Sequence, residues 1–442
     1  MINRHNLAAP DAAIAETLAE IVRQFGTPTY AYDVRRMRGQ VNKLREHLPG
    51  SIAILYSLKA NASLGICDVF ADCGIGADVA SAGELATAVA AGFAPEHIFV
   101  AGPFKSAETI AQLCELPEAI VSVDSPSELR WLADQSLGNR FVLRLRPDFG
   151  SAAVVTAGSD SRFGFTDGDL RQCRDVVGPG RNRVVGFHVF AGSQVLEAAG
   201  VVAHLDGAFE LCRRAADLLA IAPVLFNLGG GFGVPYGPDR DELDLGPIAD
   251  QLATLADRAA PTRIVLELGR YLVAQAGWYL TTVLGSQTNQ GRPAVVVDGG
   301  THQRADLCGL GLRHKARPPA VLSQHSSEVG ATDVLGCLSL PADLLAESAA
   351  LPKLSPGAVL AFPNAGAYGM WSSPALFHGS PLPAEVAFDG QTIFPMRERR
   401  SAESILEGQR HVPHNDDGRA ADGRTIRHAA RPRPSTVHVG GS

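Results

Sequence analysis

Eight short apolar runs dominate the chain between Ile52 and Arg270, and helix-like segments rich in Ala, Leu, Glu and Arg separate them. Two of these segments begin at Ser81 and Ser125 with a Glu three residues later, which is the capping-box pattern of a helix start. Alternating strands and helices run parallel, and eight such units predict a (β/α)8 TIM barrel. The alternative, an open doubly wound sheet, lacks its Gly-x-Gly-x-x-Gly fingerprint after the first strand. The runs begin at Ile52, Gly74, Ile98, Ile120, Phe141, Val184, Pro223 and Arg263.

The pattern changes after the eighth run, where apolar stretches are broken by Gly and Pro turns with little helix between them. We therefore predict a barrel over residues 34–270 and an all-β, barrel-like C-terminal domain over residues 271–395. The N-terminal segment, residues 1–33, contains the strand-like run Thr27–Asp33, which we expect to join the β-domain. Residues 396–442 lack periodic apolar positions and are expected to form a disordered tail.

Composition excludes several classes of function. The chain is 46% hydrophobic and can bury large cores, and its formal net charge of −7 argues against a nucleic-acid-binding protein. No apolar run is long enough for a signal peptide or a membrane span. The seven cysteines are scattered, without a Cys-x-x-Cys pair. They fit reduced thiols in the cytoplasm and predict neither a disulfide framework nor a metal site.

Chemically distinctive residues gather at the predicted C-terminal ends of the strands, where TIM barrels place their active sites. Lys59 follows the first strand. A strand-end lysine commonly points into solvent, but it can also form a Schiff base at a barrel mouth. An ordinary turn explains any one of these residues, but not their coincidence at most of the strand ends. Besides Lys59, the distinctive strand-end residues are Asp78, Arg144, His188, Phe190, Ser193, Gly229, Gly230, Gly231, Glu267, Gly269 and Arg270.

Together these residues have a chemical logic. A Gly-rich loop after the seventh strand lets backbone N–H groups approach an anion, and Arg270 adds a fork of donors suited to phosphate. Lys59 can hold an aldehyde as an imine, and a carboxylate such as Glu267 keeps a neighbouring ring nitrogen protonated. A lysine, a phosphate site and a carboxylate indicate pyridoxal 5′-phosphate (PLP), an electron sink for carbanions.

Eight motifs occur in a specific order along the chain: YSLKAN, ADVASAGEL, SRFGF, GFHVFAGSQ, LGGGFG, ELGR, VDGG and AGAYG. As an ordered set they resemble those of the alanine-racemase-fold (fold type III) PLP-dependent decarboxylases, which include diaminopimelate and ornithine decarboxylases. The resemblance implies a PLP-binding barrel and a β-domain, with Lys59 as the Schiff-base lysine and Glu267 as the partner of the pyridine nitrogen. It also implies a homodimer with shared active sites. The phosphate ligands it implies are Ser193, Gly230, Gly231, Arg270 and Tyr368.

The barrel departs from the family pattern at one position. Phe190 stands where the family usually has the histidine that stacks on the cofactor ring, and His188 lies two residues before it. An aromatic face at Phe190 still stacks but exchanges no proton. His188 either shares that role or packs in the core, and in a regular strand the two side chains point the same way.

The β-domain departs at two further positions. The family motif is Gly-Pro-x-Cys-x-x-x-Asp, whose cysteine protonates the carbanion, whereas this chain has GCLSLPAD. Aligned on Gly336 and Asp343, Ser339 takes the cysteine position and Cys337 the proline position. We expect Cys337 or Ser339 to donate this proton, although Cys337 is equally compatible with a small buried hydrophobe. In many diamine-producing relatives, the residue directly after this cysteine is acidic and meets the distal amine of the substrate. Here that residue is Leu340, so Leu340 and Asp343 are the expected substrate residues.

The predicted reaction is loss of the α-carboxylate of an amino acid or an amino-acid conjugate through Lys59. The motifs look most like the branch found in natural-product pathways, some members of which act on carrier-protein thioesters. Three alternatives remain: a diaminopimelate- or ornithine-type decarboxylase of primary metabolism, a racemase, and a catalytically inactive PLP-binding homologue. Glu267 argues against a racemase, which usually places an arginine at the pyridine nitrogen.

Overall fold

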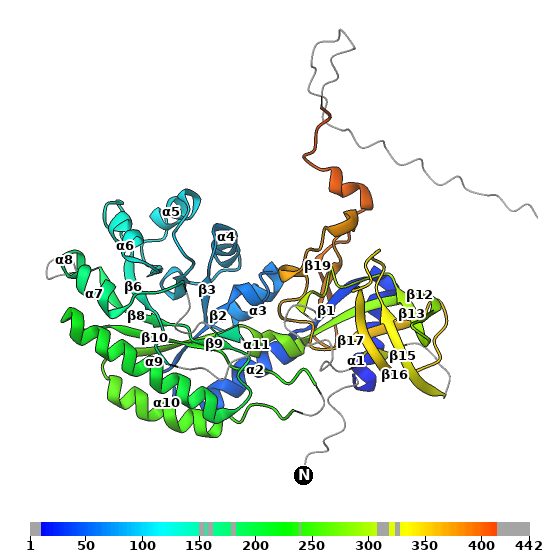
Figure 1. The fold of residues 1–442 in the computed structure, drawn as a ribbon, viewed down its shortest axis with the longest axis horizontal. Helices are drawn as coiled ribbons and strands as arrows, with labels where there is room; N and C mark the ends of the chain where they lie inside the picture. Colours follow the sequence, from blue (N-terminus) through cyan, green and yellow to red (C-terminus); the bar gives the residue numbers. More distant parts are fainter. Residues whose placement is uncertain are drawn as a thin grey trace, which may run out of the picture.

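The computed structural model of the chain describes residues 10–149, 155–156, 162–177, 183–237, 240–306, 318–322 and 328–412. Two regions lie side by side: a barrel surrounded by helices, and a domain built mostly from strands (Figure 1). The short helix α11 (Arg270–Val273) follows the last barrel strand and leads into the second region.

Within the described residues, eight parallel strands close into a barrel, as the alternation of apolar runs predicts. The ring closes where β11 pairs in parallel with β2. The strands are β2 (Ala53–Ser57), β3 (Gly76–Val79), β4 (Ile98–Val100), β5 (Ile120–Val123), β6 (Arg140–Leu145), β8 (Val184–Val189), β10 (Leu225–Gly230) and β11 (Arg263–Leu268). A separate two-stranded sheet pairs β7 (Val155–Thr156) with β9 (Gly192–Ser193).

Helices cover the outside of the barrel. Ser81 accepts the N–H of Glu84 at 3.2 Å and Ser125 accepts that of Glu128 at 3.3 Å, so both Ser-x-x-Glu patterns do begin helices. The helices of the barrel region are α2 (Val34–His47), α3 (Leu64–Asp72), α4 (Ala82–Ala90), α5 (Ala107–Cys114), α6 (Pro126–Ala133), α7 (Asp167–Gln172), α8 (Arg174–Val177), α9 (Ala198–Leu219) and α10 (Gly246–Ala259).

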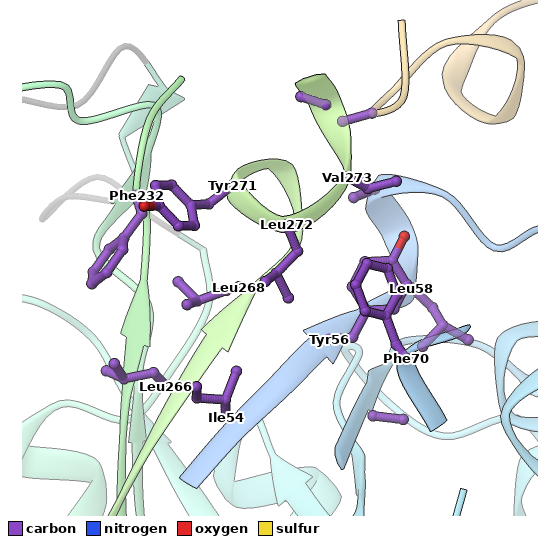
Figure 2. Packing of buried hydrophobic residues seen from close by; sticks show 14 of the residues in the cluster. Ile54, Tyr56, Leu58, Phe70, Phe232, Leu266, Leu268, Tyr271, Leu272 and Val273 are labelled. Carbon is purple, nitrogen blue, oxygen red and sulfur yellow. The ribbon is translucent and has the colours of Figure 1, made fainter. Parts of the chain in front are cut away.

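The apolar core lies between the strands and these helices. Ile54 and Tyr56 on β2 and Leu266 and Leu268 on β11 belong to one large buried cluster (Figure 2). The rings of Tyr56 and Phe70 are 4.1 Å apart. Burying each side chain of this size contributes about 1.5–3 kcal/mol. This packing makes the barrel a rigid support for the residues at its mouth.

The alternate positions on the strands face the inside of the barrel. Five of them form a separate small apolar cluster: Leu55, Phe99, Val142, Leu225 and Val265. Because side chains alternate along a strand, the residues two positions further on also point inward, one layer closer to the C-terminal end. Those residues are Ser57, Ala101, Arg144, Asn227 and Glu267. A mostly polar layer therefore lies directly above the apolar floor.

In the described ranges, nine strands form the sheet of the second region. β1 (Thr29–Asp33), the early strand seen in the sequence, lies in this sheet, antiparallel to β12 and parallel to β18. The barrel followed by an all-β domain confirms the predicted fold class. The other strands are β12 (Gly277–Asn289), β13 (Arg292–Val297), β14 (Ala320–Val321), β15 (Val329–Leu335), β16 (Leu344–Pro352), β17 (Val359–Phe362), β18 (Ala384–Phe388) and β19 (Ile393–Arg397).

The N-terminal segment also contains a helix that the sequence reasoning missed, α1 (Ala12–Phe25). Its buried face is formed by Ile14, Leu18 and Ile21, and packs on the outer side of the sheet against Trp278 and Phe388. The signal was present, because these apolar residues recur at helical spacing and Asp11 caps the first turn.

The predicted tail differs from the structure at its beginning. Residues 396–412 include the end of β19 and a short 3-10 helix, η6 (Ala402–Leu406), whereas residues 413–442 of the predicted disordered tail lie outside the described residues. None of the helices in the described part of the chain combines the length and apolarity needed to cross a bilayer.

Candidate active site

Lys59 lies just beyond β2, in the 3-10 helix η1 (Leu58–Ala60) at the barrel mouth. Its Nζ is 3.7 Å from Oδ2 of Asp78 and 4.8 Å from the centre of the Phe190 ring. Desolvation opposes the charge on the amine, but Asp78 and Glu267 outweigh it and raise the pKa of Lys59 above its usual range. The side chain remains 42% exposed and lines the pocket.

Two buried carboxylates lie near Lys59, and their surroundings push their pKa values in opposite directions. Burial raises the pKa of Asp78, and the negative charge of Glu267 adds to this, while Lys59 offsets part of it. Burial also disfavours ionised Glu267, but His188 at 3.3 Å, Lys59 and the amide of Asn227 at 2.6 Å lower its pKa below the usual range. Asp78 is therefore suited to exchanging a proton, and Glu267 to staying ionised.

The Gly-rich loop after β10 leaves no room for side chains. A Cβ at Gly230 would lie 2.1 Å from the carbonyl oxygen of Glu267, and one at Gly231 would lie 2.5 Å from that of Gly192. Gly231 also has φ +79°, a conformation that residues with a side chain rarely adopt. These glycines let the backbone approach both the neighbouring strand and a ligand.

Arg270 lies buried at the start of α11. Its Nη1 donates to the hydroxyl of Tyr236 at 2.8 Å, and its guanidinium carbon is 4.5 Å from the centre of the Tyr368 ring. The backbone N–H of Tyr368 donates to the carbonyl of Ala60 at 2.7 Å, which ties the β-domain to the turn that carries Lys59. The barrel and the β-domain therefore build this end of the pocket together.

The pocket suits a ligand with an aldehyde and an anionic group. Among the described residues, two buried polar atoms near it have no hydrogen-bond partner: Oδ1 of Asp78 and Nε of Arg270. Such atoms commonly mark a ligand. The pocket is lined by Ser57, Lys59, Phe190, Ser193, Gly231, Phe232, Glu267, Leu268, Gly269, Arg270 and Tyr368.

Phe190 and His188 occupy different depths. Phe190 stands at the mouth between Lys59 and Arg144, whose guanidinium carbon is 5.9 Å from its ring centre. Arg144 is held by Asp124 at 3.2 Å. His188 is buried one layer lower, between the hydroxyl of Ser122 at 2.9 Å and Glu267. The structure thus places Phe190 at the barrel mouth and His188 in a deeper position.

The four predicted residues of the β-domain loop do not join this set. Cys337, Ser339, Leu340 and Asp343 line no part of the pocket described above. Asp343 is buried and accepts N–H groups from Thr301 at 2.7 Å and from Leu338 at 2.8 Å. Leu340 and Cys337 both have exposed surface. The Cys337 thiol is nevertheless partly desolvated, and this desolvation, followed by the charge of Asp343, raises its pKa.

Several residues of the site escaped the sequence reasoning. Ser57 donates to Asp78 at 2.8 Å, and Asn227 and Ser122 contact Glu267 and His188. The alternation of side chains along a strand could have predicted all three. Each lies two positions after an apolar residue that faces the inside of the barrel, namely Leu55, Leu225 and Ile120. No sequence signal marks Tyr236.

Comparisons with known proteins identify the family of the chain. The family model "Pyridoxal-dependent decarboxylase, pyridoxal binding domain" matches residues 34–274. An L-glutamyl-[BtrI acyl-carrier protein] decarboxylase of Niallia circulans is 30% identical, over 90% of this chain and 97% of the relative. A diaminopimelate decarboxylase of Zymomonas mobilis is 28% identical, over 89% of this chain and 95% of the relative. A solved structure of diaminopimelate decarboxylase from Helicobacter pylori, complexed with L-lysine, has a TM-score of 0.78 and 26% identity, covering 88% of this chain and 98% of that one.

The fold and the site define an enzyme that uses PLP on a TIM barrel joined to a β-domain. The chain belongs to the pyridoxal-dependent decarboxylase family, since the family model covers more than half of it. It is a PLP-dependent amino acid decarboxylase, a carboxy-lyase, as the sequence predicts.

Proposed function

We propose that this enzyme removes the α-carboxylate of an amino acid presented as a conjugate, in the first place a thioester on a carrier protein, in a natural-product pathway. The observation that carries the proposal is Leu340, an apolar residue that is 45% exposed on the β-domain loop. An apolar residue there offers no ion pair to a free distal ammonium. The name of the Niallia circulans relative, which specifies a glutamyl group on an acyl-carrier protein, supports the same substrate class.

The barrel residues would hold the cofactor. When bound, PLP supplies the electron sink for the pair that CO₂ leaves behind. Lys59 would hold the aldehyde carbon, and Phe190 would cover one ring face without exchanging a proton. Arg144, held by Asp124, supports Phe190 from the side. The phosphate would be held by Ser193, Gly229, Gly230, Gly231, Gly269, Arg270 and Tyr368.

Two carboxylates would manage protons at the cofactor. Glu267, kept ionised by His188 and Asn227, would hold the proton of the ring nitrogen. Asp78, 3.7 Å from the amine of Lys59, would exchange a proton with it as the amine binds and leaves the aldehyde carbon.

The β-domain loop would deliver the proton to Cα after CO₂ leaves. We propose Cys337 or Ser339 as the donor, acting across a homodimer in which the loop of one subunit reaches the pocket of the other. Ser339 Oγ lies 3.4 Å from Nε2 of His378, a second group able to carry a proton. Leu340 would contact the substrate. Asp343 would set the shape of the loop instead, because its buried carboxylate is already occupied by N–H donors.

We place the reaction in the cytoplasm. The six cysteines in the described part of the chain are all free, which fits a reducing compartment.

The test is CO₂ release by the PLP-loaded enzyme from a matched panel of substrates. One half contains free lysine, ornithine, diaminopimelate, arginine and glutamate, and the other contains aminoacyl thioesters on a carrier protein, including glutamyl. Lys59→Ala serves as the blank. We expect release from the tethered half. Strong release from a free diamino acid would instead identify a decarboxylase of primary metabolism.

A further inference from the structure

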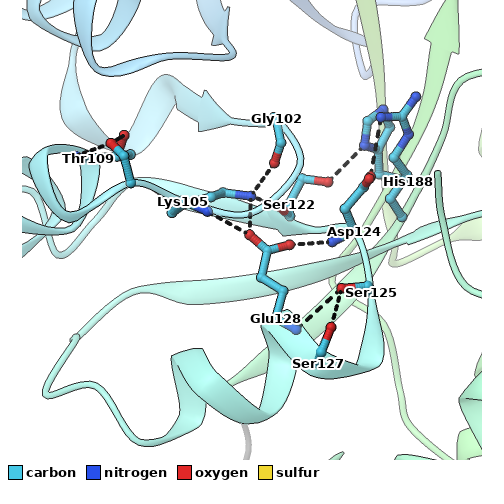
Figure 3. A network of polar contacts seen from close by, with 11 residues as sticks. Gly102, Lys105, Thr109, Ser122, Asp124, Ser125, Ser127, Glu128 and His188 are labelled. Carbon is cyan, nitrogen blue, oxygen red and sulfur yellow. Dashed lines mark hydrogen bonds and ion pairs between the residues drawn. The ribbon is translucent and has the colours of Figure 1, made fainter. Parts of the chain in front are cut away.

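A buried polar network connects the end of β5 to Glu267, and the chemistry proposed above does not use it. Ser122 Oγ lies 2.9 Å from Nδ1 of His188 (Figure 3). The opposite ring nitrogen, Nε2, lies 3.3 Å from Oε1 of Glu267. Ser122 and His188 are each 2% exposed. The imidazole therefore stands between one hydroxyl and one carboxylate, shielded from solvent.

The strand end that carries Ser122 is anchored by a buried ion pair. Lys105 Nζ lies 3.1 Å from Oε1 of Glu128 and donates to the carbonyl of Gly102 at 2.8 Å and to that of Ser122. Oε2 of Glu128 accepts the N–H of Asp124 at 2.8 Å. Figure 3 shows these groups converging on the segment between Ser122 and Asp124. Burying such a pair costs desolvation energy, so we infer that the Lys105–Glu128 pair fixes the position of this strand end more than it stabilises the fold.

The contacts of His188 select one arrangement of its proton. A bare Nε2 facing the Glu267 carboxylate would be repelled, so in a neutral imidazole the proton belongs on Nε2. Nδ1 is then an acceptor, and the hydroxyl of Ser122 is placed to donate to it. Phe99 packs edge-on against the imidazole with ring centres 5.3 Å apart, which restricts its rotation.

We propose that Ser122 is a positioning residue for the cofactor: by fixing the Nε2–H form of His188, it keeps Glu267 ionised against the ring nitrogen of PLP. The Lys105–Glu128 pair holds Ser122 in place. This inference rests on the proposed role of Glu267. The other groups that interact with the Glu267 carboxylate are Asn227, Lys59 and Asp78. Among the described residues, the Ser122 hydroxyl hydrogen-bonds to His188 and to none of these three.

The experiment uses full-length protein loaded with PLP that is ¹⁵N-labelled at the ring nitrogen. The variants are Ser122→Ala, Ser122→Thr, which keeps the hydroxyl, and Ser127→Ala. Ser127 is a matched control because it is an exposed serine in the first turn of α6, where its hydroxyl contacts Ser125. The readouts are the ¹⁵N shift of the cofactor, which reports protonation of the ring nitrogen, and the dissociation constant of PLP measured without substrate. Thermal melting confirms that each variant folds.

We expect Ser122→Ala to move the ¹⁵N signal toward the unprotonated value and to weaken PLP binding by about 10-fold to 100-fold. Ser122→Thr and Ser127→Ala should keep both wild-type values. In a His188→Leu background Ser122→Ala should add nothing, because the two residues act in series. A wild-type signal in Ser122→Ala, or additive effects of the two changes, overturns the inference alone. An unprotonated ring nitrogen in the wild-type enzyme overturns it together with the role proposed for Glu267.

Discussion

The barrel mouth and the β-domain loop between Gly336 and Asp343 are built in opposite ways. Lys59, Asp78 and Glu267 stand on strand ends backed by a continuous core, and Glu267 is held from two sides by His188 and Asn227. Ser339 and Leu340 are exposed, and the loop that carries them is held from below by the buried carboxylate of Asp343. The comparison teaches that the residues proposed to act on the cofactor are held in place by buried contacts, whereas the part expected to meet the substrate lies on an open surface.

The first test of this comparison removes the amine at the barrel mouth. Lys59→Ala should lower turnover by at least about 10³-fold, because no other described amine stands beside Asp78 to hold the aldehyde carbon. Decarboxylation kinetics and the absorption band of the lysine-bound cofactor measure the effect. Lys43→Ala is the control and should behave as wild type. Lys43 does not line the pocket, and its Nζ pairs with Oε2 of Glu242 at a distance of 2.8 Å. Full activity of Lys59→Ala contradicts the site assignment.

The second test adds a side chain to the Gly-rich loop after β10. Gly231→Ala should strain the backbone at φ +79° by about 1–3 kcal/mol and force a Cβ against the carbonyl of Gly192. The expected result is a large loss of PLP affinity, measured by equilibrium binding, with a lower melting temperature. Gly83→Ala on α4 is the matched control, because a Cβ there meets nothing closer than 3.9 Å. Unchanged PLP affinity in Gly231→Ala shows that the phosphate lies elsewhere.

The third test turns to the proton donor on the loop. Ser339→Ala or Cys337→Ala should lower turnover by about 10²-fold, the low end of the range for loss of one acid–base group. Ser339→Cys should raise turnover above wild type, because a thiol is the stronger acid. Turnover in D₂O with analysis of product stereochemistry separates the two donors. If both Ala variants keep normal rates and stereochemistry, the loop does not supply the proton.

The fourth test has the smallest expected effect. Leu340→Glu should shift the ratio of kcat/KM values toward free diamino acids by up to about 5-fold, since one exposed ion pair contributes at most about 1 kcal/mol. Competition between free and carrier-bound substrates measures the ratio. Leu340→Gln controls for polarity without charge. An unchanged ratio in Leu340→Glu excludes this residue as a specificity contact.

The period of repeating apolar residues and the order of short motifs determined much of this protein from the sequence alone. Eight apolar runs predicted the barrel, and strand-end residues such as Lys59, Glu267 and Arg270 do line one pocket. These features are local: a strand's periodicity and its last residues are properties of one segment, and closure of a parallel barrel brings all C-terminal ends together.

Only the tertiary structure decided which residues act on one another across strands. Asn227 and His188 reach Glu267 from β10 and β8, Tyr236 reaches Arg270 from a loop, and Ser122 reaches His188 from β5. It also showed that the Asp343 carboxylate is buried beneath the loop and bonded to Thr301. Such contacts join residues tens of positions apart, and depend on register and side-chain packing, so no single segment of the sequence contains them.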